Sequence, residues 1–157
     1  SILRTRKATA LEKIGALIPG YVGYADREAM RHTDKLVRMR VHDVLSNAKR
    51  TLQIRLERTA RGLEADQLRT LDRCRKELDT LAAQFRYAPY GASGFFADFK
   101  VKEAELEEVL EMDLHIAAQL EPLTEASENS DFPALQGHIQ DISQQLEARN
   151  RFLQERK

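Results

Sequence analysis

Residues 26–61 read DREAMRHTDKLVRMRVHDVLSNAKRTLQIRLERTAR, a stretch without proline or glycine. Its apolar residues recur at the spacing of one helix face, at Met30, Val37, Val41, Val44, Ala48 and Leu52. This spacing is typical of an amphipathic helix that turns its apolar stripe toward a core. Asp26 is a suitable N-cap and Gly62 a natural C-terminal stop. The stretch therefore predicts one helix of about 50 Å over residues 26–61.

A second helical pattern follows Gly62 almost at once and covers residues 64–87. Such a short connection makes the two helices antiparallel neighbours. Cys74 occupies an apolar position of this second helix, which predicts a small buried thiol. Arg73, Arg75 and Lys76 keep a second interpretation open, because cations beside a partly exposed cysteine favour a reactive thiolate.

Two further helices are predicted over residues 102–128 and 132–156. Pro122 lies inside the first, where proline is expected to kink the helix or end it early. The polar residues 128–131 can cap the next helix, and Pro133 suits its first turn. The last helix carries a heptad seam, formed by Leu135, Ile139, Ile142, Leu146, Arg149 and Leu153.

A shorter helix is expected within residues 1–19, where Pro19 and Gly20 end the pattern. Long amphipathic helices with few breakers predict an all-α fold and a single helical domain over residues 1–157. We expect an elongated antiparallel bundle of three to four long, coiled-coil-like helices. An ordered loop rich in Tyr, Gly and Phe would connect the second and third of them.

Charge is divided unevenly along the chain although the net charge is zero. Residues 1–62 carry 14 Lys/Arg and 6 Asp/Glu, whereas residues 63–157 carry 11 and 19. The basic half could attract nucleic acid or an anionic membrane surface. Alternatively, the basic helix packs beside the acidic one within the same fold.

Most familiar catalytic and cofactor motifs are missing from the sequence. It has no P-loop, no His-Glu-x-x-His pair and no Glu-x-x-His motif, and ASGF at 92–95 is not a nucleophile elbow. We therefore expect no catalytic residue, no metal site and no cofactor. No apolar run reaches the length of a membrane span and no stretch has the layout of a signal peptide, so a cytoplasmic location is expected. The single Cys74 agrees with a reducing compartment.

Asp113 is an unusual residue on the apolar side of the predicted helix 102–128. It lies three residues after Leu110 and four before Ala117, so a half-buried carboxylate is predicted. Such a group needs a partner. We expect an Arg or Lys of residues 26–61, or the backbone of residues 88–101, and a structural role.

Two Tyr/Gly segments interrupt the helices, GYVGY at 20–24 and RYAPYGASGFF at 86–96. Antiparallel pairing of the first two long helices would bring both segments to one end. The end is interpreted either as a packed structural loop or as a surface that binds a ligand or partner. Its candidate binding residues are Tyr21, Tyr24, Arg27, Arg31, Asp34, Arg38, Arg86, Tyr87, Tyr90, Gly91, Ser93, Gly94, Phe95 and Phe96.

These segments also carry a resemblance. IPGYVGYADREAMRHTDKLVR followed by RYAPYGASGFF resembles an uncharacterised group of small bacterial and archaeal helical proteins. That group pairs a GYxGYxxRE…DK start with an RYAxYGxSGFF loop, and the similarity covers about residues 18–101. Ala92 stands where the group has an aromatic residue. The resemblance implies an intact helical domain and implies no activity.

Three functions follow as hypotheses. The first is a non-enzymatic interaction or scaffold protein that binds other proteins or a second copy of itself through helix faces. The second is binding to an anionic membrane or to nucleic acid through residues 1–62. The third is a small-molecule or anion site at the Tyr/Gly end, in a pocket lined by Tyr24, Arg27, Arg38, Tyr87 and Tyr90.

Overall fold

The computed structural model describes residues 2–59, 61–87 and 103–154, with side chains at 9–26, 28–59, 61–86 and 107–152. These residues form five helices and the segments between them, and they contain no strand, so the all-α class is confirmed. The helices are α1 (Ile2–Leu17), α2 (Arg27–Thr59), α3 (Ala65–Tyr87), α4 (Glu103–Glu128) and α5 (Phe132–Gln154).

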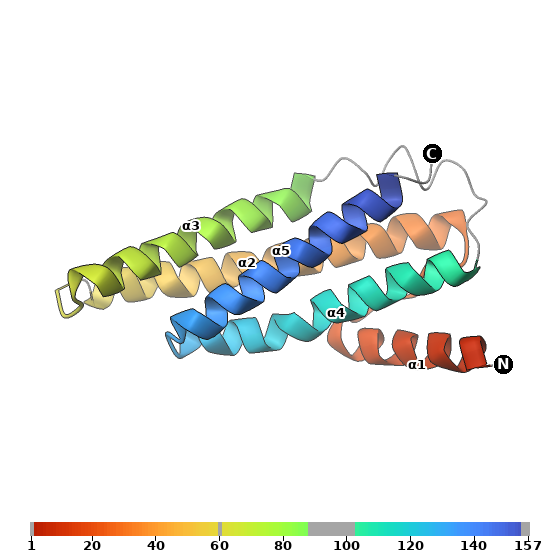
Figure 1. Ribbon diagram of the computed structural model, residues 1–157, viewed down its shortest axis with the longest axis horizontal. Helices are drawn as coiled ribbons and strands as arrows, with labels where there is room; N and C mark the ends of the chain where they lie inside the picture. Colours follow the sequence, from red (N-terminus) through yellow and green to blue (C-terminus); the bar gives the residue numbers. More distant parts are fainter. Residues whose placement is uncertain (1, 60, 88–102, 155–157) are drawn as a thin grey trace.

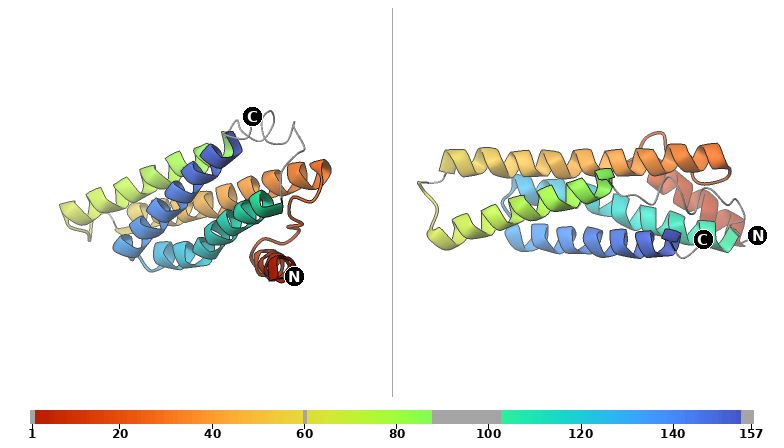
Figure 2. Two further views of the ribbon diagram at one scale, coloured as in Figure 1. Left: turned by 45° about the vertical axis from the view of Figure 1, so that its right-hand side comes forward. Right: turned by 90° about the horizontal axis from the view of Figure 1, so that it is seen from above.

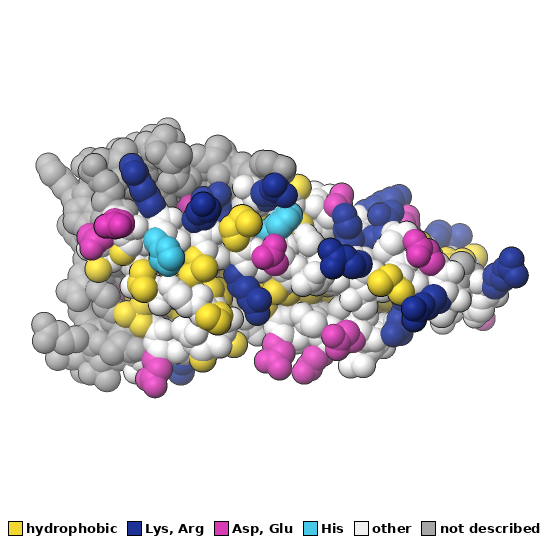
Figure 3. All heavy atoms as spheres, turned by 180° about the vertical axis from the view of Figure 1, so that it is seen from behind, with side chains coloured by type: hydrophobic (Ala, Val, Ile, Leu, Met, Phe, Trp, Pro, Cys, Tyr) yellow, Lys and Arg dark blue, Asp and Glu magenta, His cyan; other side chains and the backbone are white. Residues whose placement is uncertain are grey.

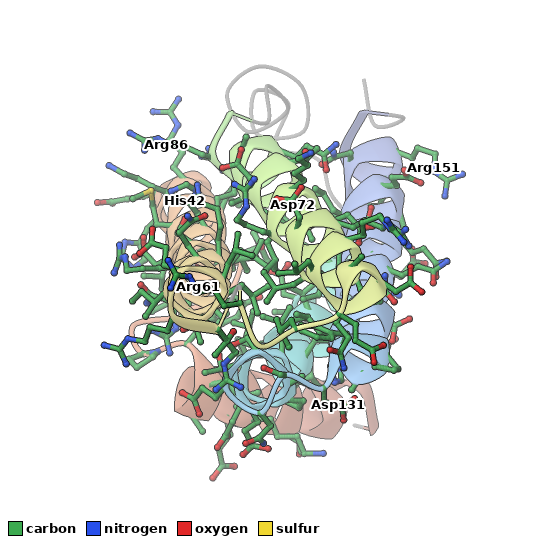
Figure 4. All side chains as sticks on the ribbon, turned by 90° about the vertical axis from the view of Figure 1, so that its left-hand side faces the viewer. His42, Arg61, Asp72, Arg86, Asp131 and Arg151 are labelled. Atoms are coloured by element: carbon green, nitrogen blue, oxygen red, sulfur yellow. The ribbon has the colours of Figure 1, made fainter. Side chains whose placement is uncertain are left out.

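The helices α2, α3, α5 and α4 surround a common interior, and α1 lies outside it against α4 (Figures 1 and 4). Consecutive helices α2 and α3 run in opposite directions, as do α4 and α5 (Figure 1). The neighbours α3 and α5 run in the same direction, as do α2 and α4. The apolar periodicity alone could not predict this order, because it identifies the buried face of a helix but not the helix packed against it.

The apolar positions that the periodicity predicts on α2 and α3 face the interior. Met30, Val37, Val41 and Leu52 on α2 are at most 1% exposed. Leu78 and Phe85 on α3 are also completely buried, as is Cys74. The α2–α3 pair extends beyond the α4–α5 turn at one end of the molecule (Figure 2, right).

Local capping explains where two helices begin. Asp26 accepts a hydrogen bond from the Ala29 N–H at 2.8 Å, which satisfies one free donor in the first turn of α2. Asp131 does the same for the Ala134 N–H at the start of α5, at 3.3 Å. The chain reverses just before Asp131 through Ser130, whose φ of 54° lies in the left-handed region.

Pro122 does not end its helix, and α4 continues to Glu128. A proline has no N–H, so the carbonyl of Ala118 loses its helical partner. Both residues lie on the exposed side of α4, where water can replace that bond. The expected early end is therefore wrong.

Candidate functional site

The segment between α1 and α2 is held on α2 by two contacts. Thr33 donates its hydroxyl to the carbonyl of Gly23 at 2.6 Å, and His32 Nε2 lies 3.2 Å from the carbonyl of Gly20. Gly23 has a φ of 79°, and a Cβ there would lie 2.9 Å from Leu11 Cδ2. The positive φ favours glycine, and a Cβ here would also require the end of the Leu11 side chain of α1 to shift. These contacts direct Tyr21 and Tyr24 into the interior.

Both tyrosine hydroxyls bind one carboxylate oxygen, Asp113 Oδ2 on α4. Tyr21 donates to it at 2.8 Å, and Tyr24 donates through a short hydrogen bond. The other oxygen, Asp113 Oδ1, accepts from Arg149 Nε at 2.9 Å. Arg149 Nη2 donates to the Tyr24 hydroxyl at 2.9 Å. Asp113 therefore joins α4 to α5 and to the segment before α2.

A second carboxylate, Asp34 on α2, lies on the other side of Arg149. Arg149 Nη2 is 3.0 Å from Asp34 Oδ1, close enough for an ion pair, although its direction does not meet the geometry of a hydrogen bond. Asp34 Oδ2 accepts from Arg38 Nε at 3.0 Å. We call the six residues Tyr21, Tyr24, Asp34, Arg38, Asp113 and Arg149 the buried polar cluster.

Charge in the buried polar cluster is balanced, with two guanidinium groups facing two carboxylates. Arg149 and Asp113 are 0% exposed, and Arg38 is the most exposed member of the cluster, with 22% of its side chain exposed. Buried charges are tolerated when they are paired and hydrogen-bonded. The cluster therefore serves as an internal joint of the fold.

The tyrosines of the cluster hold their protons firmly. Burial, together with the negative charge of Asp113, raises the pKa of Tyr21 well above its usual value of 10.0. Burial is also the main cause that raises the pKa of Tyr24, against the opposing charge of Arg149. Both hydroxyls are consequently neutral donors near neutral pH, which suits a structural role better than proton abstraction.

One of the two expected partners of Asp113 was wrong. Among the described residues its cation comes from α5, not from residues 26–61, and two tyrosines also bind it. The other expected partner, the backbone of residues 88–101, lies outside the described residues. The carboxylate is also completely buried, not half-buried. Sequence reasoning placed Arg149 in an apolar seam without assigning it a partner.

The candidate binding residues separate into groups in the structure. Tyr21, Tyr24, Asp34 and Arg38 come together in the buried polar cluster. The side chains of Arg31 and Arg86 are exposed, and Arg86 points away from the helices (Figure 4). The remaining candidates have side chains outside the described residues, namely Arg27, Tyr87, Tyr90, Gly91, Ser93, Gly94, Phe95 and Phe96. Residues 88–96 are also outside the described residues, so the expected contact between residues 20–24 and 86–96 stays a prediction.

An open groove of about 990 Å³ lies between α3 and α5. One face of α3, from Arg69 to Gln84, forms one wall, and one face of α5, from Gln136 to Glu147, forms the other. The lining residues Leu81 and Ile139 are 3% and 6% exposed and contribute apolar surface at its base. Figure 4 looks along the helices and shows α3 beside α5 on the side opposite α1.

The charged residues of the groove include three cations (Arg69, Arg73, Lys76) and three anions (Asp72, Glu77, Glu147). Lys76 lies 3.1 Å from Asp72, and hydrogen bonds from Arg75 and Lys76 lower the pKa of Asp72. Arg73, Glu77 and Glu147 form no ion pair within the described part of the chain. The groove thus presents unpaired charges of both signs.

Burial raises the pKa of the Cys74 thiol to about 11, which opposes thiolate formation at neutral pH. No group of three His, Cys, Asp or Glu that could hold a metal ion occurs among the described residues. None of the helices in the described ranges is long and apolar enough to cross a membrane.

Comparison with known proteins does not assign the chain to a family. No protein-family model matches the chain, and neither the curated proteins nor the solved structures include a significant match. Arguments about function therefore rest on the geometry of this chain alone.

Proposed function

We propose that this chain is a non-enzymatic interaction or scaffold protein that binds a helical protein partner in the groove between α3 and α5. The observation that carries the proposal is the groove itself, with apolar residues at its base and unpaired charges on its walls. Partner helices commonly bind to such surfaces, with apolar side chains in the groove and polar contacts at the rim.

The buried polar cluster supports the same proposal indirectly. Its tyrosine hydroxyls and its carboxylates are engaged with one another inside the fold, so they are poorly placed to contact a substrate. The groove, in contrast, is open to solvent along two helices. This contrast favours binding through a helix surface over chemistry at the Tyr/Gly end.

The proposal includes the finer features expected from the sequence. The chain would be a cytoplasmic, bacterial-type protein with an elongated, coiled-coil-like antiparallel bundle and an ordered Tyr/Gly/Phe loop after α3. Reduced Cys74 and the resemblance of residues 18–101 to small bacterial and archaeal helical proteins support this part.

Capture experiments with two matched tryptophan variants test the proposal. Ser143→Trp fills the groove from α5, whereas Asn47→Trp places the same side chain on the exposed face of α2. Immobilised wild-type chain and Asn47→Trp should retain the same identified protein from extracts of the producing cell, and Ser143→Trp should lose it. The purified partner should bind the wild-type chain and Asn47→Trp equally well, and it should not bind Ser143→Trp. Equal retention by all three proteins, or no groove-dependent partner of any kind, contradicts the proposal.

A second candidate function rests on the outer face of α2. Arg50 and Arg58 of α2 and Arg61 of the following turn are exposed, and Figure 3 shows Lys and Arg side chains gathering toward the α2–α3 turn. Such a surface could bind nucleic acid or anionic lipid, with an affinity that falls as salt rises. Binding to DNA or to phosphatidylserine vesicles at low salt, weakened in an Arg58→Glu/Arg61→Glu variant, is the expected result. Absence of binding at low salt eliminates this candidate.

A further inference from the structure

The charges beside the α3–α5 groove are separated along its length. Residues 66–76 of α3, where α3 begins beyond the start of α5 (Figure 1), carry four Lys/Arg and two Asp/Glu. We call this stretch the basic end. Residues 77–84 of α3 and 136–147 of α5, which we call the acidic end, carry four Asp/Glu and no Lys or Arg. The groove is therefore polarised, although the charges in its lining balance.

Ion pairs within α3 leave the basic end positive. Asp72 is shared by two cations of the same helix. Asp66 pairs with Arg69, but both side chains are largely exposed, so this pair is weak and can exchange for another. Arg73 forms no ion pair among the described residues. A partner can therefore place carboxylates against Arg69 and Arg73.

The acidic end keeps its negative charge in the same way. One of its four anions, Asp79, pairs with α2 at 2.7 Å. Glu77 and Glu147 in the groove lining form no ion pair within the described part of the chain. The cations that follow this end along α3 and α5, Arg86 and Arg151, point away from the space between the two helices (Figure 4). A partner can therefore place cations against Glu77 and Glu147.

The shape of the groove suits a single helix. Its two walls run in the same direction (Figure 1) and enclose about 990 Å³, with the apolar residues Leu81 and Ile139 at the base. A helix is a convex rod about 10 Å across, and one with an apolar face can insert that face between two helices. Its charged side chains would then lie along the walls, within reach of the two ends.

We propose that the groove binds an amphipathic helix of a partner protein, whose acidic half lies at the basic end and whose basic half lies at the acidic end. This inference rests on the proposed function and names the chemistry of the partner. Asp/Glu near the N-terminus and Lys/Arg near the C-terminus stabilise a helix. The partner helix therefore begins at the basic end and runs in the same direction as α3 and α5. About 16 residues span the α3 wall.

Two designed peptides test the charge order. Each has about 16 residues, the same composition and the same apolar face. The segregated peptide has Glu in its first half and Lys in its second half, whereas the mixed peptide alternates them. Fluorescence anisotropy at low salt should show the wild-type full chain binding the segregated peptide about tenfold more tightly, because several exposed ion pairs add. Ser143→Trp, which fills the groove, should abolish binding of both peptides.

The direction of the bound peptide is the sharper observation. A nitroxide label on the N-terminus of the segregated peptide should broaden the amide NMR signals of residues 69–73. The same label on its C-terminus should broaden those of residues 144–147. Labels that broaden both ends equally would overturn the proposed direction.

Exchanging the charges of the two ends should turn the peptide around. The exchange variant carries four substitutions, Arg69→Glu, Arg73→Glu, Glu77→Lys and Glu147→Lys. Circular dichroism confirms that it is folded, and the two broadening patterns should change places. Arg40→Glu/Asp43→Lys exchanges two charges on the exposed face of α2, so it is the matched control and should keep the wild-type pattern.

Equal affinity for the two peptides, no binding of either, or a pattern that the exchange variant leaves unchanged would overturn the inference. The proposed function fails separately, because capture of the natural partner tests it. A protein captured by the wild type and lost in Ser143→Trp, without any preference for the segregated peptide, overturns the charge order and leaves the interaction function standing.

Discussion

Arg149 and Lys76 are both cations on long helices, and each contacts an aspartate at close range, yet their surroundings are opposite. Arg149 is 0% exposed and lies between Asp113 and Asp34, whereas 69% of the Lys76 side chain is exposed beside Asp72. A buried charge that loses its partner is strongly unfavourable, while an exposed pair contributes little to stability. The comparison teaches that the buried charges hold the fold together, and that the exposed charges are available to a partner.

Arg149→Met should destabilise the fold more than any other change considered, because it leaves Asp113 and Asp34 buried without their shared cation. We expect the free energy of unfolding to fall by about 3–5 kcal/mol. Denaturant unfolding followed by circular dichroism measures the change. Lys76→Met is the matched control and should keep the wild-type midpoint; similar losses in both variants would contradict the assignment.

Tyr24→Phe and Tyr21→Phe separate the two hydroxyls of the cluster. The Tyr24 hydroxyl donates to Asp113 and accepts from Arg149, whereas the Tyr21 hydroxyl has the Asp113 bond. We expect Tyr24→Phe to lower the free energy of unfolding by about 1–3 kcal/mol, and Tyr21→Phe to lower it less. The reverse order, measured in the same unfolding assay, would contradict this ranking and show that the Tyr21 hydroxyl contributes more to stability than the Tyr24 hydroxyl.

Alkaline pH should weaken the buried polar cluster. The folded pKa of Tyr21 and Tyr24 lies above the unfolded value of 10.0, so the folded state keeps protons that the unfolded state releases. Their contribution to stability is complete below pH 10 and is lost as pH rises above it. Unfolding midpoints should fall above pH 10 in the wild type, and fall less in a Tyr21→Phe/Tyr24→Phe variant.

Asp79→Asn should have the smallest effect. Asp79 is 63% exposed and pairs with Lys49 at 2.7 Å, and that hydrogen bond lowers the pKa of Asp79. We expect no measurable change in the unfolding midpoint at neutral pH, because water replaces the lost contact. A clear loss would mean that surface pairs also stabilise this fold.

Much of the fold follows from the sequence because local signals determine it. Asp26 and Asp131 mark two helix starts, and the apolar spacing of residues 26–61 and 64–87 predicts α2 and α3 to within a few residues of their observed ends. The order of helices around the interior does not follow, because periodicity contains no information on which faces meet. Parallel contact between α3 and α5, and so the groove, could not be predicted.

The buried polar cluster was only partly predictable. Asp113 was identified as a carboxylate that needs a partner, but its cation was sought on the wrong helix. A usable signal existed, since Asp113 lies 18 residues before Asp131 and Arg149 lies 18 residues after it. An antiparallel α4–α5 pair that turns near Asp131 therefore brings the two side chains level. The contribution of Tyr21 and Tyr24 depends on how the segment before α2 folds back, which no helical pattern specifies.

A double-mutant cycle on Arg149 and Asp113 tests the central contrast most directly. The free energy of unfolding is measured for Arg149→Met, Asp113→Leu, the double variant and the wild type, with Lys49→Met and Asp79→Leu as the surface cycle. We predict a coupling energy of at least about 2 kcal/mol for the buried Arg149–Asp113 pair. For the surface pair of Lys49 and Asp79 we predict a coupling energy indistinguishable from zero. Equal coupling in the two cycles would contradict the account, because the buried charges would then have no special role in holding the fold.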